Sequence, residues 1–105
     1  DIYLYTRGAP GTPSTIENLT RSPSMQFDPW VSGRYVVWTD QRHGPSGTAW
    51  QLDNTEVYLY DIETGRNEKI SVPNKGGGLN GHTHLPDVSP SGRYVAYTAK
   101  ATNIG

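Results

Sequence analysis

The chain has 105 residues, a formal net charge of −1 at pH 7, 12 glycines, 8 prolines and no cysteine. This length allows one domain at most, and the scattered charges give no basic surface of the kind that nucleic acids or anionic membranes bind. The absence of cysteine excludes disulfides and cysteine-ligated metal sites. Frequent aromatic residues, glycines and prolines are typical of short strands joined by turns. Apolar runs are too short for a membrane-spanning helix.

Two segments of the chain occur twice. "DIYLY" at 1–5 returns as "EVYLY" at 56–60, and "GRYVVWT" at 33–39 returns as "GRYVAYT" at 92–98. Six of the seven positions in the second pair are identical or exchange one aromatic residue for another. Because both matches occur in the same order, we interpret them as a repeated folding unit.

The repeated segments have the alternation of β-strands. In "RYVVWT", Tyr35 and Val37 share one face of the predicted strand, and Val36 and Trp38 share the opposite face. A strand that is apolar on both faces belongs to a sheet that is covered on both sides. Since the composition disfavours helices, we expect the covering layers to be other sheets, as in a radial stack of small sheets.

Glycines mark the turns between these strands. Gly33 and Gly92 precede the two copies of the repeated strand and allow the positive φ that a tight turn requires. Gly65 is placed to form a hairpin turn in the same way. In chain order, the predicted strands cover residues 1–6, 15–21, 26–31, 34–40, 56–61, 67–72, 85–89 and 93–99.

The second copy carries a recognisable pattern. "PDVSPSGRYVAYTA" resembles the P-x-x-S-P-D-G-(K/R)-x-(I/V)-A-(F/Y) signature of TolB-like, WD40-like β-propeller repeats, and "EVYLYDIETGRNEKIS" resembles the segment that follows it. The chain departs from the signature at Ser91, where that family commonly has Asp. The resemblance implies an all-β fold of propeller blades, each a four-stranded antiparallel sheet. It implies an outer half blade over 1–21, a complete blade over 26–72 and an inner half blade over 84–100.

One complete and two half blades leave apolar faces uncovered. Closed propellers use about four to eight blades, and exposed apolar patches normally mark an interface. We therefore expect either that the chain is an excerpt of a longer propeller or that it assembles with further copies. The expected partners are other propeller blades or proteins.

Two groups of residues are candidates for binding. His82 and His84 lie two residues apart, with Asp87 close behind, and two histidines with one carboxylate can hold a divalent metal. The alternative is a polar loop that enters an inner strand, and we expect no cofactor. Trp50, in the long loop at 44–54, and Trp30 are candidates to stack on a sugar ring or to anchor a protein. The alternative for both rings is packing against the sheets.

No recurring catalytic set is present, and no serine lies in a G-x-S-x-G element. The leading hypothesis is a non-catalytic propeller scaffold for protein–protein interaction or assembly. The resemblance implies that it is part of a larger extracytoplasmic protein, which is periplasmic, secreted or at the cell surface. The alternatives are a carbohydrate-binding propeller and the non-catalytic propeller portion of a hydrolase or a polysaccharide lyase.

Overall fold

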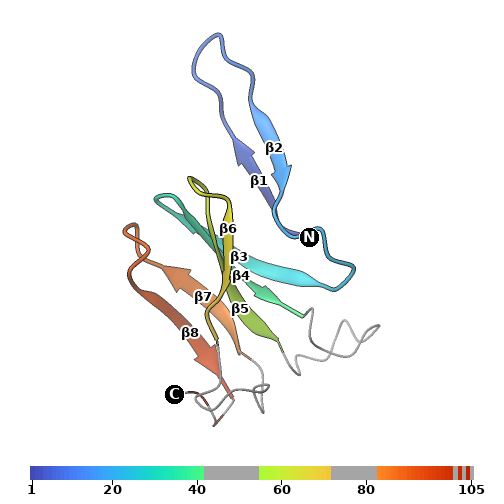
Figure 1. Ribbon diagram of the computed structural model, residues 1–105, viewed down its shortest axis with the longest axis vertical. Helices are drawn as coiled ribbons and strands as arrows, with labels where there is room; N and C mark the ends of the chain where they lie inside the picture. Colours follow the sequence, from blue (N-terminus) through green and yellow to red (C-terminus); the bar gives the residue numbers. More distant parts are fainter. Residues whose placement is uncertain (42–54, 72–82, 101, 103, 105) are drawn as a thin grey trace.

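The computed structural model of the protein describes residues 1–41, 55–71 and 83–100, with residues 102 and 104. These residues form eight strands and no helix, which confirms the predicted all-β class (Figure 1). Each strand overlaps one of the predicted segments. The strands are β1 (Tyr3–Thr6), β2 (Thr15–Asn18), β3 (Gln26–Ser32), β4 (Tyr35–Asp40), β5 (Glu56–Asp61), β6 (Arg66–Lys69), β7 (Thr83–Val88) and β8 (Val95–Ala99).

All strand pairs are antiparallel, and they form three sheets. β1 pairs with β2, β3 to β6 form a four-stranded sheet in sequence order, and β7 pairs with β8. The described residues do not close into a barrel or a ring. Within them there is no helix long and apolar enough to cross a membrane.

The predicted strand at 15–21 is shorter in the structure because Asn18 ends it with a turn. The Asn18 Oδ1 atom accepts hydrogen bonds from the backbone N–H groups of Thr20 and Arg21, both at 3.0 Å. Arg21 adopts a positive φ of 47° at this turn. A side-chain oxygen that binds nearby backbone donors competes with continuation of the ladder, which the strand pattern alone does not reveal.

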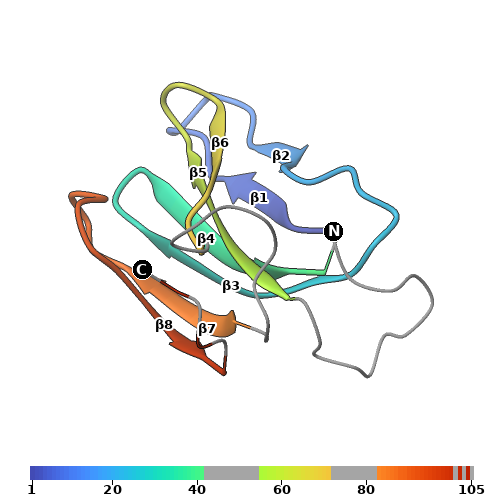
Figure 2. The same cartoon turned by 60° about the horizontal axis from the view of Figure 1, so that its bottom comes forward.

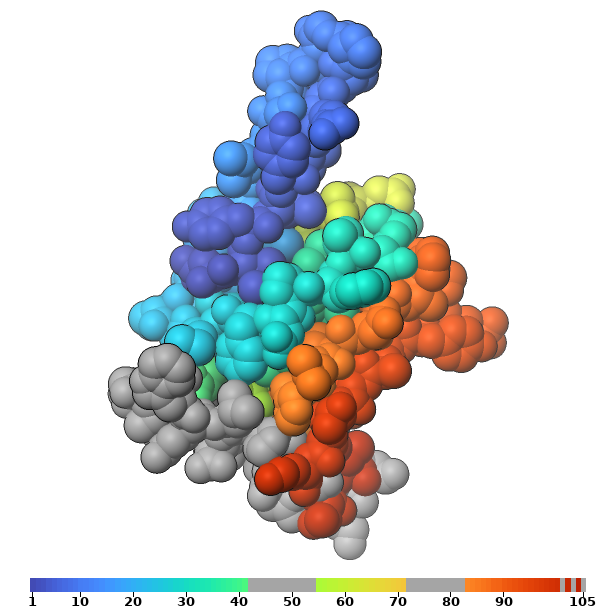
Figure 3. All heavy atoms as spheres, turned by 180° about the vertical axis from the view of Figure 1, so that it is seen from behind, coloured from blue at the N-terminus to red at the C-terminus, as the bar shows by residue number. Residues whose placement is uncertain are grey.

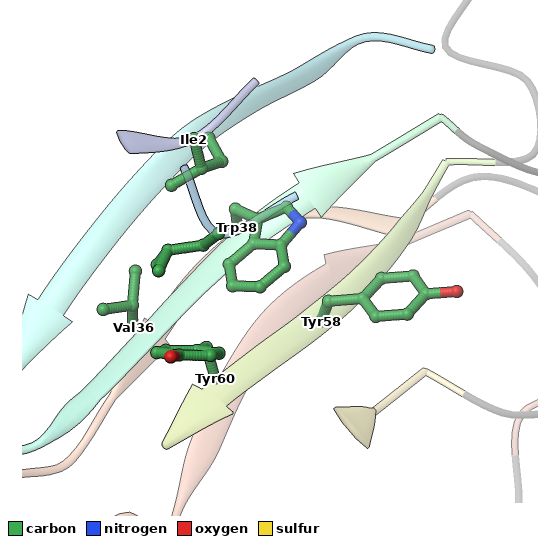
Figure 4. Packing of buried hydrophobic residues seen from close by; sticks show 6 residues of the cluster. Ile2, Val36, Trp38, Tyr58 and Tyr60 are labelled. Atoms are coloured by element: carbon green, nitrogen blue, oxygen red, sulfur yellow. The ribbon is translucent and has the colours of Figure 1, made fainter. Parts of the chain in front are cut away.

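The β1–β2 hairpin covers one face of the central four-stranded sheet. The cluster consists of Ile2 and Leu19 from the hairpin region and Val36, Trp38, Tyr58 and Tyr60 from β4 and β5 (Figure 4). Trp38 is fully buried, its ring centroid lies 6.2 Å from that of Tyr58, and its indole N–H donates to Asp40 Oδ2 at 3.0 Å. Burying the large indole with its polar group satisfied makes Trp38 the centre of this cluster.

The β7–β8 hairpin covers the opposite face. Val37 and Leu59 of the central sheet pack against Val88, with Tyr35, Ile70 and Val95 at the margin. Strand β7 lies beside β4, β3 and β5. Figure 2 shows the central sheet between the two hairpins. The predicted division of β4 into two apolar faces, each covered by another sheet, is therefore confirmed.

The first strand of each repeat bulges at the same place. Register shifts fall between Phe27 and Trp30 in β3 and between His84 and Asp87 in β7. At each bulge the residue before a proline has a φ of 53°, and the two residue pairs are Asp28–Pro29 and Leu85–Pro86. Both strands lie at a sheet edge, where a bulge accommodates a proline that cannot donate to the ladder. The repeat therefore includes the irregularity of the strand as well as its regular part.

A buried polar cluster joins the central sheet to β7. The Thr55 hydroxyl donates to the carbonyl oxygen of Thr83 at 2.7 Å, and the Thr83 hydroxyl lies 3.0 Å from the carbonyl oxygen of Thr55. The Ser71 hydroxyl accepts from the Val57 N–H at 2.8 Å. Thr55, Ser71 and Thr83 are fully buried. Because unsatisfied buried polar groups are costly, these bonds hold the start of β7 against β5.

The glycine turns of neighbouring sheets pack against each other. Gly33 and Gly92 have positive φ values of 58° and 71°, as the turn pattern predicts. A Cβ atom on Gly33 would collide with the carbonyl oxygen of Pro90, and one on Gly92 would collide with the ring of Tyr35. Glycine is thus required at these turns both for backbone conformation and for contact between sheets.

We expect Gly33→Ala to destabilise the fold more than Gly11→Ala. Both glycines have positive φ, which costs about 1–2 kcal/mol for an L-residue. A Cβ on Gly11 meets nothing within 4 Å, whereas one on Gly33 meets the Pro90 backbone, and overpacking adds about 1–3 kcal/mol. Chemical denaturation of both variants measures the difference. Equal losses of stability would show that the turns do not hold the sheets together.

Candidate functional site

Of the predicted binding residues, the structure describes Trp30, His84 and Asp87. Trp30 lies on the edge strand β3 with 53% of its surface exposed. Its register partner is Val37, which places it on the face of the central sheet that β7 partly covers. Trp50 and His82 lie outside the described residues. The pairing of Trp50 with Trp30 as a ligand site therefore stays a prediction.

His84 and Asp87 both lie on β7. Their register partners are Thr98 and Ala96, so the bulge between them brings both side chains to the same face of the hairpin. His84 is half-buried and Asp87 is exposed. Among the described residues no three His, Cys, Asp or Glu side chains gather to hold a metal ion. Because His82 is outside that part of the chain, the metal site stays a prediction.

An open groove of about 590 Å³ lies between the outer part of the central sheet and the start of β8. It was not predicted from the sequence as a site. Apolar and charged side chains both contribute to it. The lining residues are Arg34, Tyr35, Leu59, Asp61, Thr64, Arg66, Glu68, Ile70, Gly92, Arg93 and Val95.

The groove has an apolar floor and a charged rim. Leu59, Ile70 and Val95 belong to the cluster that β7 and β8 form with the central sheet. At the rim Arg34 binds two carboxylates, since its Nη2 lies 2.7 Å from Asp61 Oδ2 and its Nη1 lies 2.7 Å from Glu63 Oε2. A cleft of this kind suits an amphipathic protein segment, because such a segment presents apolar side chains to the floor and polar groups to the rim.

The ion pair shifts the protonation equilibria at the rim. Partial burial favours the neutral form of Asp61, but hydrogen bonds from Arg34 and from the backbone N–H groups of Glu63 and Thr64 outweigh it and lower the pKa of Asp61. The hydrogen bond to Asp61 raises the pKa of Arg34. Both groups of this ion pair, Arg34 and Asp61, are therefore charged at neutral pH.

A second apolar surface lies on the outer face of the β1–β2 hairpin. Tyr3, Tyr5 and Ile16 are 63%, 60% and 72% exposed, and the register pairs Tyr5 with Ile16. Figure 3 shows the hairpin, in blue, projecting from the rest of the molecule. The opposite face of the same hairpin contributes Ile2 and Leu4 to the core. The hairpin is thus apolar on both faces and covered on only one.

Comparison of the chain with protein-family models, with curated proteins and with solved structures found no match.

Asp61→Asn tests the rim, and we expect this variant to be less stable than the unsubstituted chain at neutral pH. The folded-state pKa of Asp61 lies below its ordinary value of 3.8, so its contribution is present above pH 3.8 and is lost as the pH falls through the folded-state pKa. The difference in free energy of unfolding between the two proteins should shrink over that range. Urea denaturation at a series of pH values measures it.

Arg34→Gln is the matched variant, because it removes the cation that lowers the pKa of Asp61. Its stability should depend less on pH in the acid range than that of the unsubstituted chain. If both variants keep the pH dependence of the unsubstituted chain, the ion pair contributes nothing to the free energy of unfolding.

Proposed function

We propose that this chain supplies blades to a TolB-like, WD40-like β-propeller, which further copies or further blades complete, and that it acts as a non-catalytic scaffold that contacts proteins. In this proposal the central four-stranded sheet is a complete blade. The β1–β2 hairpin is the outer half of the preceding blade, and the β7–β8 hairpin is the inner half of the following one. As the resemblance implies, the whole protein is extracytoplasmic.

The observation that carries the proposal is the stacking of the two repeat copies. Each copy consists of an edge strand with a bulge at the same register position, a glycine turn and a second strand. The turn of one copy packs against the turn of the other through Gly33 and Pro90. Small antiparallel sheets stacked face to face in this way are the repeating element of a propeller.

The scaffold role is supported by the surfaces that remain uncovered. The open groove combines an apolar floor with a charged rim, and the hairpin presents tyrosines and an isoleucine to solvent. Tyrosine and arginine are enriched at protein–protein interfaces, and the residues of an interface core are mostly apolar. Both surfaces therefore have the composition of contact sites for proteins.

A capture experiment tests the proposal. The purified chain is used as bait in a cross-linking pull-down, and its self-association is followed by sedimentation velocity. We expect the chain to bind a macromolecular partner or its own copies, and the double substitution Arg66→Glu with Arg93→Glu in the groove to weaken that binding about tenfold or more. Arg21→Glu, exposed and outside the groove, is the control. A chain that binds no macromolecule and does not self-associate contradicts the proposed function.

Carbohydrate recognition is a second candidate, favoured by the exposure of Trp30. An indole ring at an edge strand with 53% of its surface exposed can stack on a sugar face. The charged groups Asp28 and Asp87 are exposed on the adjoining edge strands and can accept hydrogen bonds from hydroxyl groups.

A glycan array separates the two candidates. If the second is right, a glycan bound by the unsubstituted chain is lost in Trp30→Ala and kept in Tyr94→Ala, which removes an exposed aromatic ring just before β8. Trp50→Ala is measured in parallel. Absence of any signal that responds to either tryptophan ends the carbohydrate hypothesis.

A further inference from the structure

We propose that the open groove and the free edge of β8 receive the β1–β2 hairpin of a second copy of this chain. The two hairpins would then form one four-stranded sheet in the order β7–β8–β1–β2, with the first two strands from one copy and the last two from its partner. This inference rests on the proposed function and adds to it the identity of the partner and the register of the pairing.

The internal repeat identifies the occupant. In the central sheet, β4 pairs with β5 from Tyr35↔Asp61 to Asp40↔Glu56. The segment "GRYVAYT" that contains β8 is the repeat of "GRYVVWT", and the segment "DIYLY" that contains β1 is the repeat of "EVYLY". Within the sheets that the described residues form, β8 pairs with β7 alone and β1 pairs with β2 alone. Each is thus the repeat of a strand that pairs, and each has an open edge.

The repeat fixes the register of the missing ladder. Val36↔Tyr60 in the central sheet becomes Val95↔Tyr5, and Trp38↔Tyr58 becomes Tyr97↔Tyr3. Val37↔Leu59 becomes Ala96↔Leu4. Each pair keeps its chemistry, with an aliphatic residue opposite tyrosine, an aromatic residue opposite tyrosine and a small aliphatic residue opposite leucine. Matched cross-strand pairs of this kind stabilise sheets.

The outward-facing backbone N–H groups of β1 and β8 lie at matching register positions. In β1, Leu19 N–H donates to the Ile2 carbonyl at 2.9 Å, so the alternation of antiparallel ladders leaves the N–H groups of Tyr3 and Tyr5 facing outward. In β8, Ser89 N–H donates to the Tyr94 carbonyl at 2.9 Å, which leaves those of Val95 and Tyr97 facing outward.

These are the residues that the repeat pairs. Two open edges that present their donors and acceptors at the same register positions can form a continuous ladder.

The same pairing directs the exposed hairpin face into the groove. Val95 packs toward the central sheet, and directly opposite residues of a ladder point to the same side. Tyr5 of the partner subunit therefore lies beside Val95 over the apolar floor of the groove. This position is equivalent to that of Tyr60 in the cluster around Trp38. Ile16, the register partner of Tyr5, follows on the same face.

Glu68 at the groove also has a counterpart, Glu17, beside the cluster around Trp38. The Tyr60 hydroxyl lies 3.5 Å from Glu17 Oε1 of the hairpin that covers it. Glu17 is opposite Leu4 in β1–β2, and Glu68 is opposite Leu59 in β5–β6, so Glu68 is the repeat of Glu17. Glu68 lines the groove. It is therefore placed to accept a hydrogen bond from the hydroxyl of the partner subunit's Tyr5.

The resulting contact is head to tail, since one copy uses β8 and the groove while the other uses β1 and β2. Contacts of this type close into rings or continue as filaments. Each copy supplies the strands of two sheets, so a closed ring of about four to eight sheets contains about two to four copies.

Site-specific cross-linking tests the register, because the natural chain has no cysteine. One preparation carries Tyr3→Cys and the other carries Tyr97→Cys, and the two are mixed and oxidised. Paired residues of an antiparallel ladder have Cα atoms about 4.5–5.5 Å apart, within the range that a disulfide spans. We expect the mixed disulfide to form at least about tenfold faster than in the control mixture of Tyr3→Cys with Ala99→Cys, which leaves Tyr5 and Tyr97 in place. In the control the register is displaced by two residues, so the Cα atoms are about 7–8 Å apart or more.

Sedimentation equilibrium of the cysteine-free chain gives an independent readout. We expect the chain to self-associate, and Tyr5→Ala to raise the dissociation constant about tenfold or more. Ile62→Ala, which removes an exposed apolar side chain at the β5–β6 turn, should leave it unchanged.

A chain that stays monomeric at all concentrations overturns the inference, and so does self-association in which the two cysteine mixtures cross-link equally. A monomer that still captures another protein through the groove leaves the proposed scaffold function standing, so the two ideas fail separately.

Discussion

The fold depends on one constraint, which is that the central sheet is apolar on both faces and must be covered twice. Five consecutive residues of β4, from Val36 to Asp40, are buried. A two-faced strand of this kind has no stable position at the surface of a two-layer protein. The two hairpins therefore serve as layers, one over Trp38 and the other over Val37. The β1–β2 hairpin in turn has a second apolar face that is exposed, and this carries the demand outward from the centre.

The relative position of the layers is set by irregular features, since apolar contact is not directional. The bulges at Asp28 and Leu85 admit a proline into each edge strand and shift the side chains that follow by one position. The buried hydroxyls of Thr55 and Thr83 fix the beginning of β7 against β5. At the other end, Gly33 lets the two turns touch. The sheets are thus held at both ends of the strands, and the apolar contacts fill the space between them.

Features that depend on local sequence were predictable, and those that depend on distant neighbours were not. Side-chain alternation assigned the faces of β4, and glycine placed the turns at 33 and 92, because both follow from backbone geometry. The strand at 15–21 was predicted too long because Asn18 binds the backbone beyond it. The groove escaped prediction because its walls come from four strands, β4, β5, β6 and β8, and from the turns between strands. A signal was nevertheless present, since the repeat of "GRYVVWT" at 92–98 predicts that β8, like β4, pairs with a further strand on its second edge.

The strongest contrast in the molecule is between two copies of the same short motif. Tyr58 and Tyr60 are almost fully buried, whereas Tyr3 and Tyr5 are mostly exposed. Removing on the order of 100 Å² of each exposed tyrosine from water would contribute about 2.5 kcal/mol at roughly 25 cal/mol per Å². Together the two tyrosines contribute about 5 kcal/mol, which is near the lower end of the about 4–15 kcal/mol that association costs in lost freedom. The ladder along β8 and the burial of Ile16 must contribute as well. The tyrosine side chains and the backbone N–H groups of β1 pair with β8 at the same register positions. A shifted register would lose both kinds of contact together, so the proposed pairing selects one register.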